Sequence, residues 1–252
     1  MKRFIKKTLF LLAMAVAVAG CNSSMMNDEE DDSVPQDYTD NGGDEGFLCA
    51  IVENASKYGN VVEVKLMVHD RSINKYVELT RFDWKDDGFM IVLPKTLGSN
   101  NIYALIRDGM YPTNIDFVQS TMTISNENVR VGNVYFVGVD KNGNAIATFF
   151  SVKIDENGNT KAIFTYTDSN VNISGYTYGD GHAHPACLDC PSWFEKTTSY
   201  FVDWEKGWNV WYLSISHTRT DYVAITTEQW STAPVSGLKW HGSEENLQMF
   251  QD

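Results

Sequence analysis

The stretch VYFVGVDKNGNAIATFFSVKIDENGNTKAIFTYT, residues 134–167, decides the fold class of this chain. It contains three segments rich in β-branched and aromatic residues, 134–139, 145–154 and 161–167, which are separated by DKNGN and DENGN. Residues of these types favour strands. Asn-Gly favours a tight hairpin turn, because both residues tolerate a positive φ angle. The stretch therefore predicts a three-stranded antiparallel meander.

The first of these turns also admits a calcium interpretation. Asp140, Asn142 and Asn144 stand at alternate positions, as the first ligands of a calcium-binding loop do. In the helix-loop-helix calcium site, however, glycine is the sixth residue and a carboxylate is the twelfth. Here Gly143 is fourth and Ser151 is twelfth. A plain hairpin turn is therefore the favoured interpretation.

The chain beyond residue 45 repeats the strand pattern. Further strands are predicted at 47–52, 61–68, 76–82, 89–93, 200–204, 208–216, 222–227 and 238–240. Residues 96–106 hold the one helix candidate, and the polar stretch 121–131 places a domain boundary near Asn126. An Asp-Gly turn, an apolar strand and Leu93-Pro94 resemble immunoglobulin-like or prealbumin-like modules. We expect an all-β protein with two small antiparallel β-sandwich domains, 46–125 and 126–252.

The N-terminus has the order of a bacterial lipoprotein signal peptide. A basic opening precedes an apolar run, 8–19, and Val18-Ala19-Gly20-Cys21 closes it. These four residues resemble the lipobox, in which the cysteine thiol receives the lipid. The apolar run is shorter than the roughly 20 residues that a membrane-spanning helix needs. We expect residues 1–20 to be a signal peptide and Cys21 to carry the lipid.

Residues 21–45 predict a disordered acidic tether after the lipid, because they are rich in Asp, Asn, Gly and Ser. The run DEEDD at 28–32 resembles the export signal of surface lipoproteins of Bacteroidetes. The Gly-Trp-Asn and Gly-Leu-Lys-Trp stretches near the C-terminus resemble the same group. The resemblance implies an outer-membrane lipoprotein exposed on the cell surface. A solvated acidic tether is the simpler interpretation of the run, and the two are compatible.

The charge of the chain limits its partners. The formal charge is −13, and it becomes −17 once residues 1–20, with four basic and no acidic residues, are removed. An acidic surface repels nucleic acid and anionic headgroups. The expected contact with the membrane is therefore the lipid on Cys21. We expect no nucleic-acid partner.

One loop concentrates residues that can bind metal. His182, His184, Cys187 and Cys190 lie within nine residues, and all four are of zinc-ligand type. The spacing differs from that of common zinc modules, whose ligand pairs stand farther apart. A disulfide between Cys187 and Cys190 is the competing interpretation, because an exported chain meets an oxidising compartment. Free thiols without a role, or a metal- or thiol-dependent enzyme built on this loop, remain alternatives.

The remaining motifs favour binding over catalysis. The sequence contains no Gly-x-Ser-x-Gly elbow, no His-Glu-x-x-His pair and no phosphate-binding glycine loop. Tryptophans are frequent in the C-terminal half, and flat aromatic rings stack on sugar faces. We expect a surface protein that binds a glycan or another surface component, with Trp193, Trp208, Trp211 and Asn209 as candidate ligand residues. Tryptophans that fill a core, and a structural or assembly protein of the cell surface, are the alternatives.

Overall fold

The computed structural model describes residues 47–105, 117–156, 158–182, 193–220, 223–245 and 247–250. The strands are β1 (Phe47–Ile51), β2 (Glu63–Asp70), β3 (Lys75–Asp83), β4 (Gly88–Val92), β5 (Tyr103–Ala104), β6 (Phe117–Ser120), β7 (Thr123–Ile124), β8 (Arg130–Val139), β9 (Ala145–Asp155), β10 (Gly158–Thr167), β11 (Val171–His182), β12 (Trp193–Trp204), β13 (Gly207–Arg219), β14 (Val223–Ser231) and β15 (Lys239–Ser243). Three short 3-10 helices are η1 (Ala55–Tyr58), η2 (Ser99–Asn101) and η4 (Leu247–Phe250). The predicted all-β class is confirmed.

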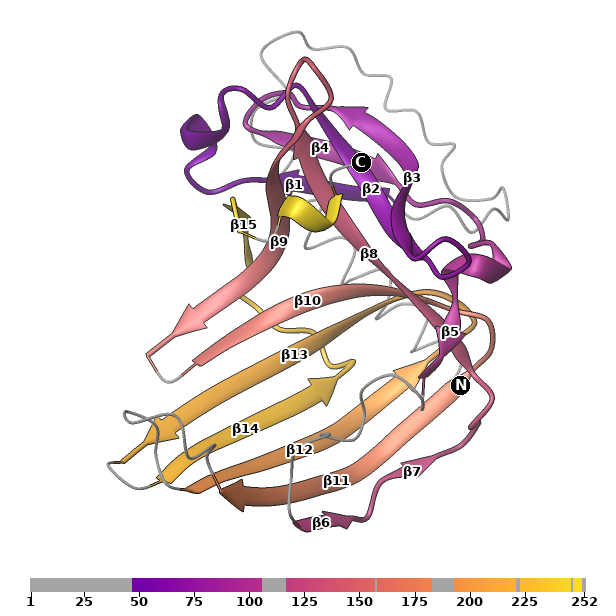
Figure 1. The fold of residues 1–252 in the computed structure, drawn as a ribbon, viewed down its shortest axis with the longest axis vertical. Coiled ribbons are helices and arrows are strands. Elements are labelled where there is room, and N and C mark those ends of the chain that lie inside the picture. The colour runs from indigo at the N-terminus through magenta and orange to yellow at the C-terminus, as the bar shows by residue number, and fades with distance from the viewer. Residues whose placement is uncertain are drawn as a thin grey trace, which may run out of the picture.

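Most strands belong to one large sheet, and β1 and β4 form a separate two-stranded sheet. The large sheet has 13 strands, and its main path runs β3-β2-β8-β9-β10-β13-β14-β12-β11-β6. In Figure 1, β1 to β4 lie in the upper part of the molecule, whereas β11 to β14 form a broad lower part. Strand β14 pairs antiparallel with β13 and parallel with β12, so it separates these two consecutive strands.

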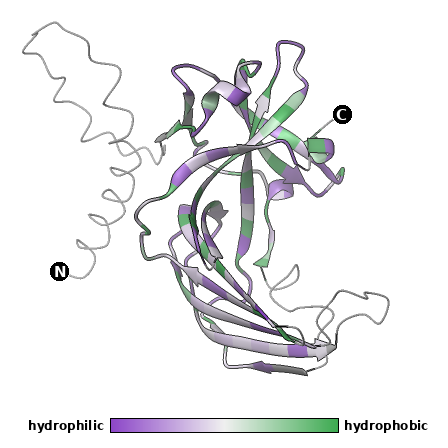
Figure 2. Cartoon of the chain, turned by 90° about the vertical axis from the view of Figure 1, so that its left-hand side faces the viewer, coloured by the Kyte–Doolittle hydropathy of each residue, from purple (hydrophilic) through white to green (hydrophobic). Residues whose placement is uncertain are grey.

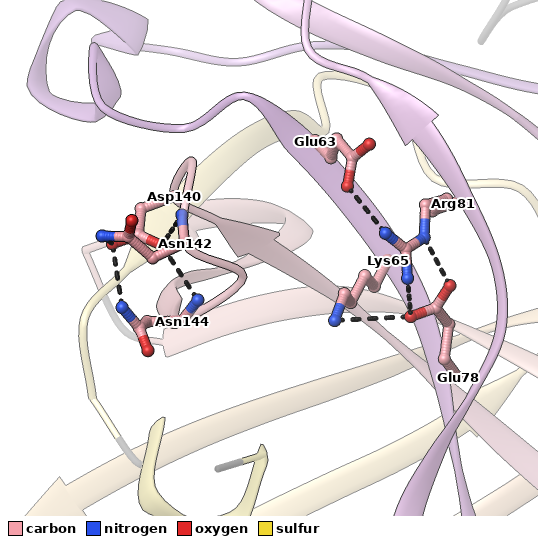
Figure 3. Close-up of polar contacts among 7 residues, drawn as sticks. All are labelled: Glu63, Lys65, Glu78, Arg81, Asp140, Asn142 and Asn144. Carbon is pink, nitrogen blue, oxygen red and sulfur yellow. Dashed lines mark hydrogen bonds and ion pairs between the residues drawn. The ribbon is translucent and has the colours of Figure 1, made fainter. Parts of the chain in front are cut away.

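The predicted meander is present as β8, β9 and β10, which pair antiparallel with one another. In the first turn, Asp140 Oδ1 accepts hydrogen bonds from the backbone N–H groups of Asn142 and Asn144, at 2.8 and 2.9 Å (Figure 3). The side-chain amide of Asn144 donates to Oδ2 at 3.1 Å. The carboxylate therefore closes the turn itself, which supports the interpretation as a plain hairpin turn.

Two hydrophobic cores lie on opposite faces of the central strands. In the upper core, Phe136, Phe164 and Trp240 are buried with residues of β1, β2 and β4. In the lower core, Trp204 and Trp211 are buried with residues of β8, β11 and β12. Because side chains alternate along a strand, β8, β10 and β13 contribute to both cores. The central strands thus join the two halves of the molecule.

The sheet crosses the boundary that was predicted at residue 126. Strand β2 lies before this residue and pairs with β8, which lies after it. Strands β6 and β7 lie before it and pair with β11. The ranges 46–125 and 126–252 therefore share one sheet and both cores. The polar stretch that suggested the boundary contains β7 and the start of β8.

The short helix expected within 96–106 is present as the three-residue 3-10 helix η2, which the short strand β5 follows. The strand expected at 200–204 is only the end of β12, which begins at Trp193, and β11 was not predicted at all. No helix in the described part of the chain is long and apolar enough to cross a membrane.

The edge of the sheet at β3 carries an ion-pair network (Figure 3). The guanidinium of Arg81 binds Glu78 at 2.6 Å and Glu63 at 3.1 Å, and Lys65 lies 3.3 Å from Glu78. All four side chains are partly exposed, so each pair adds little to stability. Charged side chains on an edge strand oppose pairing with another chain.

Candidate binding face

Trp211 is a core residue in the structure. Its side chain is buried, and its indole N–H donates a hydrogen bond to Thr165 Oγ1 at 2.9 Å. The ring lies against Trp230, with the two ring centroids 4.6 Å apart, and against Trp204 at 5.9 Å. Trp211 thus stabilises the lower core, and the structure corrects its expected place on a ligand surface.

Asn209 is likewise buried, and it fixes the connection between β12 and β13. Its amide nitrogen donates to the backbone oxygens of Glu205 and Gly207 at 2.7 and 3.0 Å. Its amide oxygen accepts from the Glu205 N–H at 3.0 Å. The amide is therefore occupied by the chain's own backbone, and the structure corrects the expectation that it binds a ligand.

The other two candidate tryptophans lie on the same side of the sheet but in different surroundings. Trp208 is half-buried beneath the upper part, where its indole N–H donates to the Pro94 carbonyl oxygen and its ring meets Tyr166 edge to face. Trp193 is half-buried at the first position of β12, away from the upper core. Of the four candidates, Trp193 alone lies on the face described below.

The cysteine and histidine loop lies mostly outside the described residues. His182 is the last residue of β11, whereas His184, Cys187, Cys190 and the lipidation candidate Cys21 lie outside the described residues. Across the described ranges, no group of three His, Cys, Asp or Glu side chains is placed to hold a metal ion. The zinc and disulfide interpretations remain predictions, which metal analysis and alkylation with and without reductant would separate.

One broad face of the described structure belongs to four neighbouring strands, β11, β12, β14 and β13. Alternation places every second residue of each strand on this face, and the strand register places them in rows. We call it the open face; its residues are Ser174, Tyr176, Tyr178, Asp180, Trp193, Glu195, Thr197, Ser199, Phe201, Val223, Ile225, Thr227, Gln229, Ser214, Ser216 and Thr218. Figure 2 shows the broad lower strands mostly in pale colours, because many of their residues are Ser, Thr and Tyr, whose hydropathy is intermediate.

Aromatic side chains form a line on the open face. Tyr176 is 37% exposed and Phe201 is 59% exposed. In the strand register Tyr176 lies opposite Ser199 and Phe201 lies opposite Ser174, so the two rings are diagonal neighbours on adjacent strands. Tyr178 follows Tyr176 on the same face of β11. The three rings therefore occupy neighbouring positions on this face, and we call them the aromatic strip.

Polar groups beside this strip are available to a ligand. Within the described part of the chain, no hydrogen bond engages the side chains of Thr197, Ser199, Thr227 or Gln229. By contrast, the hydroxyl of Ser174, at the edge of the face, is 2.9 Å from the hydroxyl of Thr123. Uncommitted donors and acceptors next to exposed rings are the combination found in sites that bind polar ligands.

The opposite face of the same strands makes this surface rigid. There Tyr200 and Val202 pack in the lower core. Lys196 pairs with Glu228 at 2.7 Å, and Thr198 donates to the same carboxylate at 3.3 Å. Open-face side chains therefore project from strands that are fixed from behind.

The sequence of β11 contains an alternating pattern that predicts this face, although hydropathy alone does not detect it. From Val171 to Gly181, buried and more exposed positions alternate, and the exposed series includes Tyr176 and Tyr178. The buried series contains Thr177 and Gly179, which are not apolar enough to mark a strand by hydropathy. Alternation of aromatic with small or hydroxyl residues would have identified β11.

The chain matches no protein-family model, and comparisons with curated proteins and with solved structures find no match.

Proposed function

We propose that this protein is a lipid-anchored cell-surface protein that binds a glycan through the open face. The observation that supports binding is the strip formed by Tyr176, Tyr178 and Phe201 beside the uncommitted hydroxyl and amide groups of β12 and β14. Sugar rings have apolar C–H faces that stack on flat aromatic rings and hydroxyl groups that exchange hydrogen bonds with polar side chains. Stacking supplies contact area, and polar groups fix orientation.

The binding proposal is tested on a glycan array with the exported chain and two variants, Tyr176→Ala and Phe201→Ala. Each variant should weaken binding by about 1–3 kcal/mol, by analogy with base–aromatic stacking, because an exposed ring is lost from the contact. Met90→Ala is the matched control, since Met90 is a large apolar residue of β4 that is 58% exposed. The control should bind as the wild type does.

Melting temperatures separate binding from folding in the same experiment. Because both rings are exposed, truncation should change stability by no more than about 0.5 kcal/mol. If the wild type binds no glycan, or if both variants bind as well as the Met90→Ala control, the proposal is overturned.

The anchor is a separate part of the proposal and rests on the lipobox at Cys21. Replacing Cys21 by Ser removes the thiol that would carry the lipid. We expect fatty-acid labelling and recovery in the membrane fraction to be lost in this variant. Equal labelling of the variant and the wild type would refute the anchor, whereas protection of the wild type from external protease on intact cells would refute surface exposure.

A further inference from the structure

We propose that the open face selects uncharged glycans and excludes anionic ones, such as uronic-acid or sulfated polymers. This inference rests on the proposed glycan-binding function and adds the class of ligand. It is drawn from the kind and position of the charges on the face.

Among the open-face residues named above, Asp180 and Glu195 carry the formal charge, and both are negative. Asp180 and Glu195 are directly opposite each other on β11 and β12. Like charges in this position destabilise a sheet, and no cation within the described residues pairs with either one. Among the described residues, these two negative charges beside the aromatic strip therefore have no cationic partner.

The lysine next to Glu195 in the sequence is directed to the other face. Lys196 follows Glu195, so alternation places its side chain on the opposite side of β12. There its ammonium group pairs with Glu228 at 2.7 Å. Lys196 is therefore already engaged behind the sheet, and it offers no counter-charge to an anion bound in front.

The carboxylates act directly on the aromatic strip. The hydroxyl of Tyr178 donates a hydrogen bond to Asp180 Oδ2 at 3.0 Å. Partial burial, together with Asp180 and Glu195, raises the pKa of Tyr178 above its usual value. An anionic group on a ligand stacked at Tyr178 would experience the same negative potential. Since the Debye length is about 8 Å at physiological ionic strength, neighbouring sugar positions would be affected too.

The net charge of the chain acts in the same direction. At −13 for the full sequence, the molecule repels anionic polymers at long range. A neutral glycan meets no electrostatic repulsion when it approaches such a surface. An anionic glycan, by contrast, must overcome both the overall and the local repulsion. Exclusion of the wrong partner by like charge is a recognised source of specificity.

The test uses pairs of polymers that share a backbone and differ in whether their substituents carry a negative charge. Hydroxyethylcellulose and carboxymethylcellulose share one backbone, as do dextran and carboxymethyl-dextran, and starch and carboxymethyl-starch. Retardation in affinity gel electrophoresis is measured for each pair at 20 and 300 mM salt, with EDTA present to remove bridging cations. At low salt the wild type should bind the neutral member about tenfold more tightly, and the difference should shrink at high salt.

In the double variant Asp180→Asn/Glu195→Gln, the affinity for the charged polymer should come to within about threefold of the affinity for the neutral one. Asp86→Asn/Asp87→Asn removes the same number of charges from the exposed turn between β3 and β4, and it should leave the preference unchanged. Equal wild-type binding of both members of a pair at low salt would overturn the inference while leaving glycan binding intact. Binding of no polymer in any pair would overturn the proposed function and the inference together.

Discussion

Asn209 shows how one side chain can fix a connection in this fold. Its amide makes three hydrogen bonds with the backbone at Glu205 and Gly207, and replacing it by Ala removes all three. The Glu205 carbonyl oxygen then keeps the hydrogen bond from the Thr167 hydroxyl, whereas the Glu205 N–H loses its side-chain acceptor. We expect Asn209→Ala to lower the free energy of unfolding by about 1–3 kcal/mol, measured by urea denaturation. Asn172→Ala, at an exposed position of β11, is the control and should stay within about 0.5 kcal/mol of the wild type. Equal stability of the two variants would show that the Asn209 amide is dispensable.

Tyr76 makes stability sensitive to alkaline pH. Burial and the neighbouring Tyr135 raise the pKa of Tyr76 to about 12, and the two rings meet edge to face at 5.3 Å. The neutral phenol is thus favoured in the folded state. Its contribution to stability is fully present below the unfolded pKa of about 10 and is lost as the pH rises toward 12.

The wild type should therefore lose stability between pH 10 and pH 12, the window set by that pKa. Tyr76→Phe should lose less, because it lacks the ionising hydroxyl. Urea denaturation at several alkaline pH values measures the difference. If the free energy of unfolding depended on pH in the same way in both proteins, the assignment would be contradicted. Titration of tyrosinate absorbance in the two proteins would show whether the phenol with the raised pKa is that of Tyr76.

Among the elements, β6 and β7 depend on a close backbone approach to β11. Gly175 has a φ angle of +105°, and a Cβ atom added there would lie 2.4 Å from the Thr121 carbonyl oxygen. Gly175→Ala should therefore separate β6 and β7 from β11 and raise hydrogen exchange of residues 117–124. The free energy of unfolding should fall by about 1–3 kcal/mol, because both overpacking and a strained φ angle destabilise the variant.

Gly143→Ala is the matched control for this strain. Gly143 also has a positive φ angle, +84°, but a Cβ atom there would meet nothing within 4 Å. Its effect should stay within the hairpin of β8 and β9. If Gly143→Ala raised exchange at 117–124 as much as Gly175→Ala does, the close approach would not be what holds β6 and β7.

The elements also show what the sequence can predict. The strands β8, β9 and β10 were predictable, because alternating apolar residues and Asn-Gly turns act locally. The strand β11 was not, because Thr177 and Gly179 face the interior without being apolar. Local residues could not predict that β14 would insert between β12 and β13, since this pairing depends on contacts between residues distant in sequence.

The sequence predicted the type of candidate site, a surface of aromatic rings, but not the residues that form it. Aromatic residues in the C-terminal half suggested a stacking surface, but sequence could not distinguish Trp211, which is buried, from Phe201, which is exposed. Both are aromatic residues within strands. Which face of the strand is covered depends on where the upper part of the molecule ends, and this is a property of the whole sheet.

For the whole molecule, the shared central strands predict one cooperative unfolding transition. Phe164 belongs to the upper core and Val202 to the lower core, but β8, β10 and β13 contribute side chains to both cores. Phe164→Ala and Val202→Ala should each lower the temperature of the same single calorimetric peak, by amounts corresponding to about 3–5 and 1–3 kcal/mol. Two peaks, each responding to only one substitution, would mean that the halves unfold independently.

The central claim is that the open face is the ligand surface, and hydroxyl-radical footprinting tests it most directly. The chain is labelled with and without the neutral polysaccharide that it retains most strongly in the affinity gel. Tyr135 provides an internal control, since it is 39% exposed and Tyr176 is 37% exposed, but it lies on β8 outside the open face. We predict protection of Tyr176, Tyr178 and Phe201, with Tyr135 unchanged. Protection at Tyr135 instead, or unchanged labelling of all four rings, would contradict the account.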